Sequence, residues 1–183
     1  MGKIEVQTCE IEGLKVITPR VIYDNRGYFS ETYNQRDMEE AGIHIDFVQD
    51  NQSASVRGVL RGLHFQKEHP QDKLVRVISG EVFDVAVDIR KGSPTFGKWY
   101  GVKLSAANKK QFLIPKNFAH GFLVLSDFAE FVYKCSDFYH PGDEGGFMYN
   151  DPDIGVEWPL SEDMKVTLSE RDTKWASFKD TFT

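Results

Sequence analysis

A histidine stands in a strand-like, positively charged stretch of the sequence, RGVLRGLHFQKEHPQDKLVRVISGEVFDVAVDIR, at residues 57–90. A strand histidine, here His64, either packs in the core or acts as a proton-transfer base. Arg61 lies three residues earlier, on the opposite face of an ideal strand, but the intervening Gly62 permits a bulge that would turn both side chains inward. Lys73 opens the next strand and is expected beside the histidine. The expected proximity of Arg61 and Lys73 favours acid/base chemistry at His64.

A second group of candidate residues lies in AEFVYKCSDFY, residues 129–139. A strand through this segment would place five side chains on one face, namely Phe131, Tyr133, Cys135, Asp137 and Tyr139. The tyrosines either enter a common cavity or pack as ordinary aromatic residues with their hydroxyls at the rim. The alternation alone leaves both interpretations open.

Two further segments carry charged candidates, each with a structural alternative. In LSERD, Asp172 either does chemistry or is the last member of a capping box that begins at Ser169, and the spacing alone favours the capping box. In DNRGYFSE, Arg26 and Glu31 flank aromatic residues and Gly27, where a solvated hairpin is the alternative. The sequence pattern thus favours a structural role for Asp172 and leaves the role of Arg26 and Glu31 open.

Motifs for the common cofactors and metal sites are absent from the sequence. It contains no Gly-rich phosphate loop, no nucleophile elbow and no paired CxxC. A metal-dependent double-stranded barrel usually offers two histidines one residue apart, whereas Gln66 occupies the second position after His64, and His120 alone cannot complete such a site. We therefore expect metal-free acid/base chemistry without a cofactor. The other histidines are expected in loops: His44, His69 and His140.

The elements that position these residues are predicted to be mostly short strands. In EVFDVAVDIR, apolar Phe83, Val85, Val87 and Ile89 alternate with Asp84, Ala86 and Asp88, which is typical of a half-buried strand. KLVRVISG, KWYGVKLS, KQFLIP and HGFLVLS are similar runs separated by turn residues. Asn34 is expected to cap a helix over QRDMEEA that ends before Gly42, and LSERDTKWASFKD is expected to form one or two short helices. Regularly spaced short strands predict an all-β sandwich or barrel.

Length and charge limit the remaining possibilities. A chain of 183 residues favours one domain, residues 1–183. A net charge of −6 opposes binding to nucleic acid or an anionic membrane surface, although a small anion could bind in a local basic pocket. No apolar stretch is long enough to span a bilayer. The cysteines, Cys9 and Cys135, are too few for a disulfide framework, so we expect a cytoplasmic protein.

Long segments distributed over almost the whole chain carry a family resemblance: RGVLRGLHFQ, KLVRVISGEVFDVAVDIRKGSPTFGKW, LSAANKKQFLIPKNFAHGFLVLS, AEFVYKCSDFYHPGDEGGF and YNDPDIGVEWP. They closely resemble the dTDP-4-dehydrorhamnose 3,5-epimerases. The resemblance implies a jelly roll, which is a cupin-like double-stranded β-helix barrel. It also implies epimerisation of dTDP-4-dehydro-6-deoxy-D-glucose at carbons 3 and 5, which gives dTDP-4-dehydro-L-rhamnose in dTDP-L-rhamnose biosynthesis.

The resemblance further implies catalytic roles. His64 resembles the family's base, and Asp172 matches the aspartate that orients it, which replaces the capping box as the preferred role. Lys73 matches a cation that steadies the enolate oxygen, since a proton beside a ketone is too weak an acid without such help. Tyr133 matches the acid that reprotonates the opposite face, and an unperturbed phenol with a pKa of about 10 carries its proton at neutral pH.

A substrate that carries a nucleoside diphosphate would explain why an acidic protein has positive charge concentrated in one region. Guanidinium groups suit a pyrophosphate. By resemblance, Tyr139 stacks on thymine, and Arg26 and Glu31 come from the partner subunit of a homodimer. The implied substrate-binding residues are Arg26, Glu31, Gln49, Asp50, Asn51, Arg61, Lys73, His120, Tyr139, Glu144 and Arg171.

Three other functions stay open at the level of the sequence. Relatives that epimerise only one carbon keep the same histidine and tyrosine, so a mono-epimerase or a ketoisomerase is an alternative. A non-catalytic sugar-nucleotide-binding jelly roll would bind dTDP-sugars without promoting proton exchange. A metal-dependent cupin would lose activity in chelator, whereas the metal-free epimerase would not.

Overall fold

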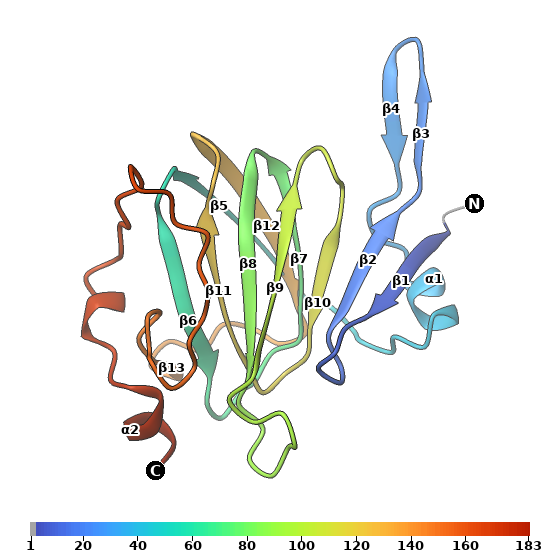
Figure 1. Cartoon of the computed structure of the whole chain (residues 1–183). Helices are drawn as coiled ribbons and strands as arrows, with labels where there is room; N and C mark the ends of the chain where they lie inside the picture. Colours follow the sequence, from blue (N-terminus) through green and yellow to red (C-terminus); the bar gives the residue numbers. More distant parts are fainter. Residues whose placement is uncertain (1–2) are drawn as a thin grey trace.

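Two antiparallel sheets face each other in the computed structural model, which describes residues 3–183 (Figure 1). The six-stranded sheet has the order β1-β2-β10-β7-β12-β5, with bounds Ile4–Thr8, Lys15–Pro19, Gln111–Ile114, Lys73–Ser79, Phe128–Cys135 and Gln49–Val56. The five-stranded sheet has the order β13-β6-β11-β8-β9, with bounds Glu144–Gly146, Leu60–Gln66, Phe118–Val124, Glu81–Asp88 and Trp99–Ser105. This arrangement is a jelly roll and confirms the expected fold class.

Apolar side chains from both sheets fill the space between them. Val75 and Phe131 of the six-stranded sheet share one buried cluster with Ala86 and Phe122 of the five-stranded sheet. The rings of Phe122 and Phe131 stack across this interior with their centroids 4.1 Å apart. Because each ring comes from a different sheet, the pair fixes the spacing of the two layers.

The outer face of the five-stranded sheet is covered as well. Leu63, Val85 and Val87 pack outward against a cluster that includes Phe147 and Phe178 of the C-terminal region. The expectation of a half-buried strand at residues 81–90 is therefore wrong, because the C-terminal segment covers the face opposite the barrel interior. Asp84 and Asp88 are 0% exposed, although alternation correctly assigns the residues to two faces.

Asp88 is buried beside a turn that satisfies its charge. Its Oδ1 accepts hydrogen bonds from the backbone N–H and Nε of Arg90 at 2.9 Å each, and its Oδ2 accepts from Ser93 and Thr95. Burial alone would raise the pKa of Asp88, but these hydrogen bonds hold it well below its usual range. The group therefore stays ionised inside the protein.

The helices follow their sequence signals. α1 spans Gln35–Glu40, and the Asn34 side chain accepts hydrogen bonds from the backbone N–H of Arg36 and Asp37. Gly42, at φ +75°, follows the end of the helix. The expected short C-terminal helices are the 3₁₀ helix η1 at Asp172–Lys174 and α2 at Phe178–Phe182. Within residues 3–183, no helix is long and apolar enough to cross a membrane.

A hairpin formed by β3 (Val21–Asp24) and β4 (Gly27–Ser30) projects away from the barrel (Figure 1). It contains most of DNRGYFSE, for which a hairpin was the structural alternative. Its large apolar side chains are exposed: Tyr23 is 69% and Phe29 is 67% accessible. Exposed apolar side chains of this size are unusual on a hairpin that is surrounded only by water.

Candidate active site

The predicted catalytic side chains line two adjoining cavities of about 400 Å³ and 470 Å³. His64, Lys73, Tyr133 and Glu144 line both, so the two cavities form one continuous cleft. The first also contains Arg61, His120, Arg171 and Asp172, and the second contains Gln49, Asn51 and Tyr139. Residues widely separated in the sequence thus meet in one place.

Strand register explains why one wall of the cleft has these side chains. In the six-stranded sheet, Lys73, Cys135 and Gln49 are register partners on adjacent strands. Two residues further along, Val75, Tyr133 and Asn51 form the next row. Because strand side chains alternate, both rows point to the same face of the sheet. That face carries Lys73 and Tyr133 into the cleft.

His64 is held by a buried carboxylate. Its Nε2 lies 2.6 Å from Asp172 Oδ1, and the two side chains are 18% and 3% exposed. Trp175 Nε1 donates to the same Oδ1 at 3.2 Å. Burial would raise the pKa of Asp172, but the hydrogen bond and charge of His64, with hydrogen bonds from Ser169 and Trp175, together outweigh burial and hold the pKa below its usual value. The carboxylate stays charged, fixes the imidazole tautomer and leaves the other ring nitrogen without a hydrogen-bond partner among residues 3–183.

The capping-box alternative for Asp172 is half correct. The Ser169 hydroxyl accepts a hydrogen bond from the backbone N–H of Asp172 at 3.1 Å, just before η1. In a complete box the acidic side chain would return to the Ser169 N–H. Instead the Asp172 carboxylate reaches His64, so the local turn positions the acid and the tertiary contact uses it.

The bulge expected at Gly62 is present. The pairing of β6 with β11 changes register between His120 and Phe122, opposite Gly62, which has φ +136°. Both Arg61 and His64 consequently line the same cavity. Arg61 donates from Nε and Nη2 to the Ser55 hydroxyl at 3.2 Å and 3.1 Å, which orients the guanidinium without neutralising it.

Lys73 does not lie beside His64 in the same sheet, contrary to expectation. β7 belongs to the six-stranded sheet and β6 to the five-stranded sheet, so Lys73 enters the cleft from the facing wall. Burial lowers the pKa of Lys73, and the negative charges of nearby acids, among them Glu144 and Asp84, partly oppose this. A desolvated ammonium of this kind interacts strongly with any anion that forms in the cleft.

Tyr133 also enters from the six-stranded sheet, on the wall that faces His64. Burial raises the pKa of its phenol, and the negative charge of Glu144 adds to the effect. The expectation of one strand through residues 129–139 is wrong, because β12 ends at Cys135 and the chain then turns. Tyr139 lines the cleft from the following loop, where its backbone N–H donates to Gln49 Oε1 at 2.9 Å.

Asp84 is a site residue that the sequence analysis did not single out. It is 0% exposed, and both carboxylate oxygens lie 3.0 Å from His120 Nε2. Burial raises the pKa of Asp84, while the charges of His120 and Lys73 oppose that increase. The available signal was an acid on the same strand face as Val82 and Ala86, because both of these pack in the barrel interior.

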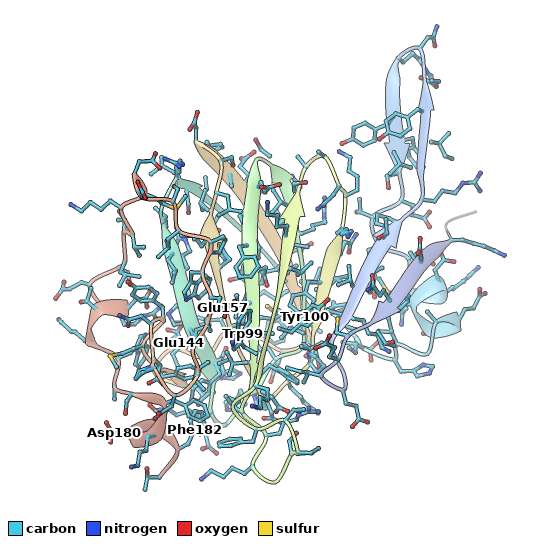
Figure 2. The ribbon with its side chains drawn as sticks, in the orientation of Figure 1. Trp99, Tyr100, Glu144, Glu157, Asp180 and Phe182 are labelled. Carbon is cyan, nitrogen blue, oxygen red and sulfur yellow. The ribbon has the colours of Figure 1, made fainter. Side chains whose placement is uncertain are left out.

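Glu144 and Arg171 close the side of the cleft near Tyr139. Glu144 begins β13, pairs with Gln66 of β6, and is labelled beside that strand in Figure 2. It forms an ion pair with Arg171 Nη1 and accepts a hydrogen bond from the Tyr139 hydroxyl at 3.4 Å. Arg171 is 50% exposed, so it can exchange Glu144 for another anion.

Three of the predicted substrate-binding residues do not join the cleft of this chain. Alternation turns Asp50 to the outer face of β5, where it pairs with Lys134 Nζ at 2.8 Å, while its neighbours Gln49 and Asn51 point inward. Arg26, 85% exposed, lies on the projecting hairpin and pairs with Asp24. Glu31 follows that hairpin and accepts a hydrogen bond from Asn34.

Gln66 occupies the position that argued against a catalytic metal, and its side-chain amide binds another residue. Gln66 Nε2 donates to Asp143 Oδ2 at 3.2 Å, and its buried Oε1 has no partner among the described residues. Gln66 lines the second cavity, whereas His120 lines the first and binds Asp84. These residues do not form the converging ligand set of a metal-dependent cupin.

A family model described as dTDP-4-dehydrorhamnose 3,5-epimerase matches residues 8–180. The chain belongs to the dTDP-4-dehydrorhamnose 3,5-epimerase family. A family member from Methanothermobacter thermautotrophicus is 54% identical over 180 residues, covering 98% of this chain and 97% of the relative. The expected family, fold and isomerase activity are thereby confirmed.

Solved structures of family members agree with the fold described above. A dTDP-6-deoxy-D-glucose-3,5-epimerase from Legionella pneumophila, in complex with dTDP-4-keto-L-rhamnose, has a TM-score of 0.92 at 52% identity, covering 95% of this chain and 92% of that chain. A 3'-monoepimerase from Streptomyces bikiniensis, in complex with dTDP-quinovose, has a TM-score of 0.86 at 34% identity, covering 92% and 85%. Of these two structures, the 3,5-epimerase has the higher identity to this chain.

Proposed function

We propose that this epimerase inverts carbons 3 and 5 of dTDP-4-dehydro-6-deoxy-D-glucose with His64 as the base and Tyr133 as the acid. The observation that carries the proposal is their placement on facing sheets, so that they flank one cleft. Inversion needs proton removal from one face of the sugar and return to the other. With the base on one wall and the acid on the other, both proton transfers can occur without turning the sugar over in the cleft.

One such pair can serve both carbons. In the gluco-configured substrate the hydrogens at carbons 3 and 5 lie on the same face of the ring, and both carbons flank the ketone at carbon 4. His64 therefore reaches either hydrogen from one wall after a small shift of the ring. Tyr133 returns protons from the other wall, and its raised pKa keeps the phenol protonated at neutral pH.

Lys73 supplies the charge that makes the proton removable. Loss of a proton next to the ketone places negative charge on the carbonyl oxygen. An ammonium that is partly desolvated in the cleft stabilises that enolate better than a fully water-exposed lysine does, because the local dielectric is lower. Asp172 acts through His64: its carboxylate stabilises the imidazolium that forms when the base takes the proton.

The remaining predicted contacts would hold the dTDP group. Arg61 and Arg171 bring guanidinium groups to the cleft, and such forks suit a pyrophosphate. Binding of the pyrophosphate would release Arg171 from Glu144. Tyr139, 50% exposed at the edge of the cleft, is proposed to stack on thymine.

The deciding experiment is proton NMR of dTDP-4-dehydro-6-deoxy-D-glucose with catalytic enzyme in deuterium oxide. We expect deuterium at both carbons 3 and 5. A reductase added to the reaction traps the product, dTDP-4-dehydro-L-rhamnose. Chelator should not change the rates, because the proposed chemistry uses no metal. Exchange at one carbon only would identify a mono-epimerase, and exchange at neither would identify a binding protein.

Two variants separate the roles in the same experiment. His64→Ala should stop exchange at both carbons, because no base remains. Tyr133→Phe should still permit exchange by His64 but should strongly reduce inversion, so deuterium enters with retained configuration. Far-ultraviolet circular dichroism checks that both variants are folded. Near-wild-type product formation by both variants would refute the assignment.

We infer that the functional unit is a homodimer. The projecting hairpin exposes Tyr23 and Phe29, and the outer face of the six-stranded sheet has a hollow of about 570 Å³ lined in part by Tyr33, Ile78 and Val132. A second copy of the chain can cover both surfaces in a closed two-fold contact. Light scattering during size exclusion should give the mass of two chains, and Phe29→Asp should shift it towards one.

The same proposal includes a cytoplasmic enzyme that binds neither nucleic acid nor membrane. Cys9 and Cys135 are both unpaired, which fits a reducing compartment. The net charge of −6 opposes extended polyanions, while the cleft gathers its cations around one small substrate.

A further inference from the structure

Two histidines and an aspartate cluster on the loops that lead to the cleft. His69 lies between β6 and β7, and Asp137 and His140 lie in the loop after β12. One ligand-type atom from each residue lies within 4.8 Å of the others. We propose that these three side chains form a binding site for a divalent transition-metal ion such as Zn²⁺. The proton-transfer chemistry does not use this site.

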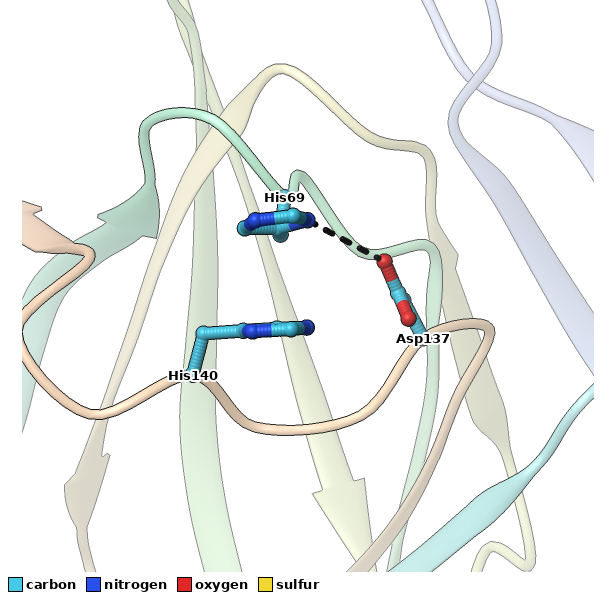
Figure 3. Close-up of side chains that lie close together, drawn as sticks. All are labelled: His69, Asp137 and His140. Carbon is cyan, nitrogen blue, oxygen red and sulfur yellow. Dashed lines mark ion pairs between the residues drawn. The ribbon is translucent and has the colours of Figure 1, made fainter.

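The side chains already converge at their nitrogen and oxygen atoms. The two imidazole rings stack with their centroids 3.7 Å apart and an interplanar angle of 12°. Figure 3 shows a nitrogen of each ring at the end that faces the Asp137 carboxylate. His69 Nδ1 lies 3.9 Å from Asp137 Oδ2, which is too long for a good hydrogen bond. A shared cation would join these atoms.

Backbone contacts fix the loop that carries His69. The Asp143 carboxylate accepts hydrogen bonds from the backbone N–H of Glu68 at 3.0 Å and of His69 at 2.9 Å. The Asp143 N–H donates in turn to the His140 carbonyl at 3.2 Å. Asp143 therefore links the backbones of the two histidines directly, which limits the cost of bringing their rings to one ion.

The other side of the cluster is fixed in the same way. Gln71 Nε2 donates to the carbonyls of Asp137 at 2.8 Å and Phe138 at 3.1 Å. The Phe138 N–H donates to Asp137 Oδ1 at 2.8 Å, which leaves Oδ2 directed towards His69. The three proposed ligands therefore lie on two loops that are connected by hydrogen bonds of Asp143 on one side of the cluster and of Gln71 on the other.

The donor set selects the class of cation. Two imidazole nitrogens and one carboxylate oxygen suit Zn²⁺, Cu²⁺, Ni²⁺ or Co²⁺, whereas Ca²⁺ and Mg²⁺ require mostly oxygen ligands. Metal–ligand bonds of about 2.1 Å bring neighbouring ligand atoms to roughly 3–3.5 Å apart, so the present atoms must approach by about 1 Å or slightly more. The rings must also tilt, and His69 can turn because its side chain is 48% exposed.

The direct test is calorimetric titration of the tag-free, full-length protein with ZnCl₂ after dialysis against chelator. We expect one saturable site per chain with a Kd of the order of micromolar. His69→Ala and His140→Ala should each weaken it by about 100-fold, and Asp137→Asn by about tenfold. Excess Mg²⁺ should not displace the zinc.

Two variants provide controls for other histidines. His44→Ala removes an exposed loop histidine outside the cluster and should bind zinc as the wild type does. His64→Asn tests whether zinc enters the catalytic cleft, and it should also retain the site. The proposal is overturned if the wild type shows no saturable binding, if His140→Ala binds like the wild type, or if His64→Asn alone removes binding. Chelator-insensitive turnover distinguishes failure of this site from failure of the proposed catalytic mechanism.

Discussion

At the scale of single residues, the proposed catalytic groups divide their work between charge and proton transfer. Asp172→Asn replaces the carboxylate 2.6 Å from His64 by an amide, which removes the charge and can impose the wrong imidazole tautomer. We expect kcat to fall by about 10²–10⁴-fold, with KM changed by no more than about threefold. Steady-state kinetics test this split. A raised KM with unchanged kcat would instead indicate a role in binding.

Lys73 should determine how activity falls at high pH. Burial lowers the folded-state pKa of Lys73 from the ordinary 10.5 and raises that of the Tyr133 phenol from 10, so the two shifts move alkaline deprotonation towards Lys73. The alkaline limb of kcat/KM should therefore lie below pH 10.5. Between the folded and unfolded pKa values the unfolded chain binds more protons, so this group favours folding increasingly as pH rises through that window.

A matched pair of variants separates these two effects of Lys73. Lys73→Met removes a half-buried, desolvated charge, so it should raise Tm at neutral pH while lowering kcat/KM by about 10²–10³-fold. Lys73→Arg keeps a charge that does not titrate, so its residual activity should lose the alkaline limb. Thermal melts and a pH profile of kcat/KM measure both. An unchanged alkaline limb in Lys73→Arg would assign that limb to another group.

Residue-level prediction from the sequence was strongest where a side chain stands next to an unusual backbone. Gly62 indicated the bulge that brings Arg61 and His64 together. The partnership of His64 with Asp172 could be inferred only by resemblance, because the two residues are separated by 108 positions and no local pattern joins them. Asp84 was missed, since alternation shows which face a residue occupies but not which buried partner satisfies it.

At the scale of elements, the close approach of β6 and β11 depends on glycine. A Cβ on Gly62 would lie 2.5 Å from Gly121 Cα and 2.9 Å from the His120 carbonyl oxygen. Gly62→Ala should therefore destabilise the fold by about 3 kcal/mol or more and displace His64. Gly92→Ala is the control, because Gly92 also has a positive φ but no atom lies within 4 Å of the place that the alanine methyl would occupy.

Chemical denaturation compares the two glycine variants. Gly92→Ala should lose only about 1 kcal/mol from backbone strain and should keep its turnover. Equal losses in both variants would show that strain alone, and not the contact between strands, makes Gly62 necessary. The comparison thus isolates the packing of β6 on β11.

Element boundaries were predictable where caps and turns are local. Asn34 and Gly42 indicated α1 correctly, because their hydrogen bonds and backbone angles involve only neighbouring residues. Burial was harder to predict. The C-terminal segment covers β8 from far along the chain, and β12 stops at Cys135 although a strand through Tyr139 was expected. Periodicity reveals neither the tertiary contact that covers β8 nor the residue at which a strand ends.

At the scale of the whole molecule, the homodimer proposal predicts complementation between two inactive variants. If Arg26 completes the partner's cleft, Arg26→Ala should lose most turnover although its own cleft is intact. In a heterodimer of Arg26→Ala with His64→Ala, one site carries both defects and the other carries none. Mixing equal amounts under exchange should restore about one quarter of wild-type activity. No recovery, with heterodimers verified by mass, would contradict a shared site.

The order of strands in the sheets also determines when activity can first appear during folding. β2 pairs with β10, β5 with β12, and β6 with β11 and β13. Each of these N-terminal strands therefore finds its partner only after a strand much later in the sequence is available. Such non-local pairing makes folding slow and leaves strand edges open in partly made chains. Asp172 reaches His64 only when the C-terminal segment docks. Recovery of turnover after dilution from denaturant should therefore lag behind recovery of β-sheet circular dichroism, and the delay would time the docking of the C-terminal segment onto the barrel.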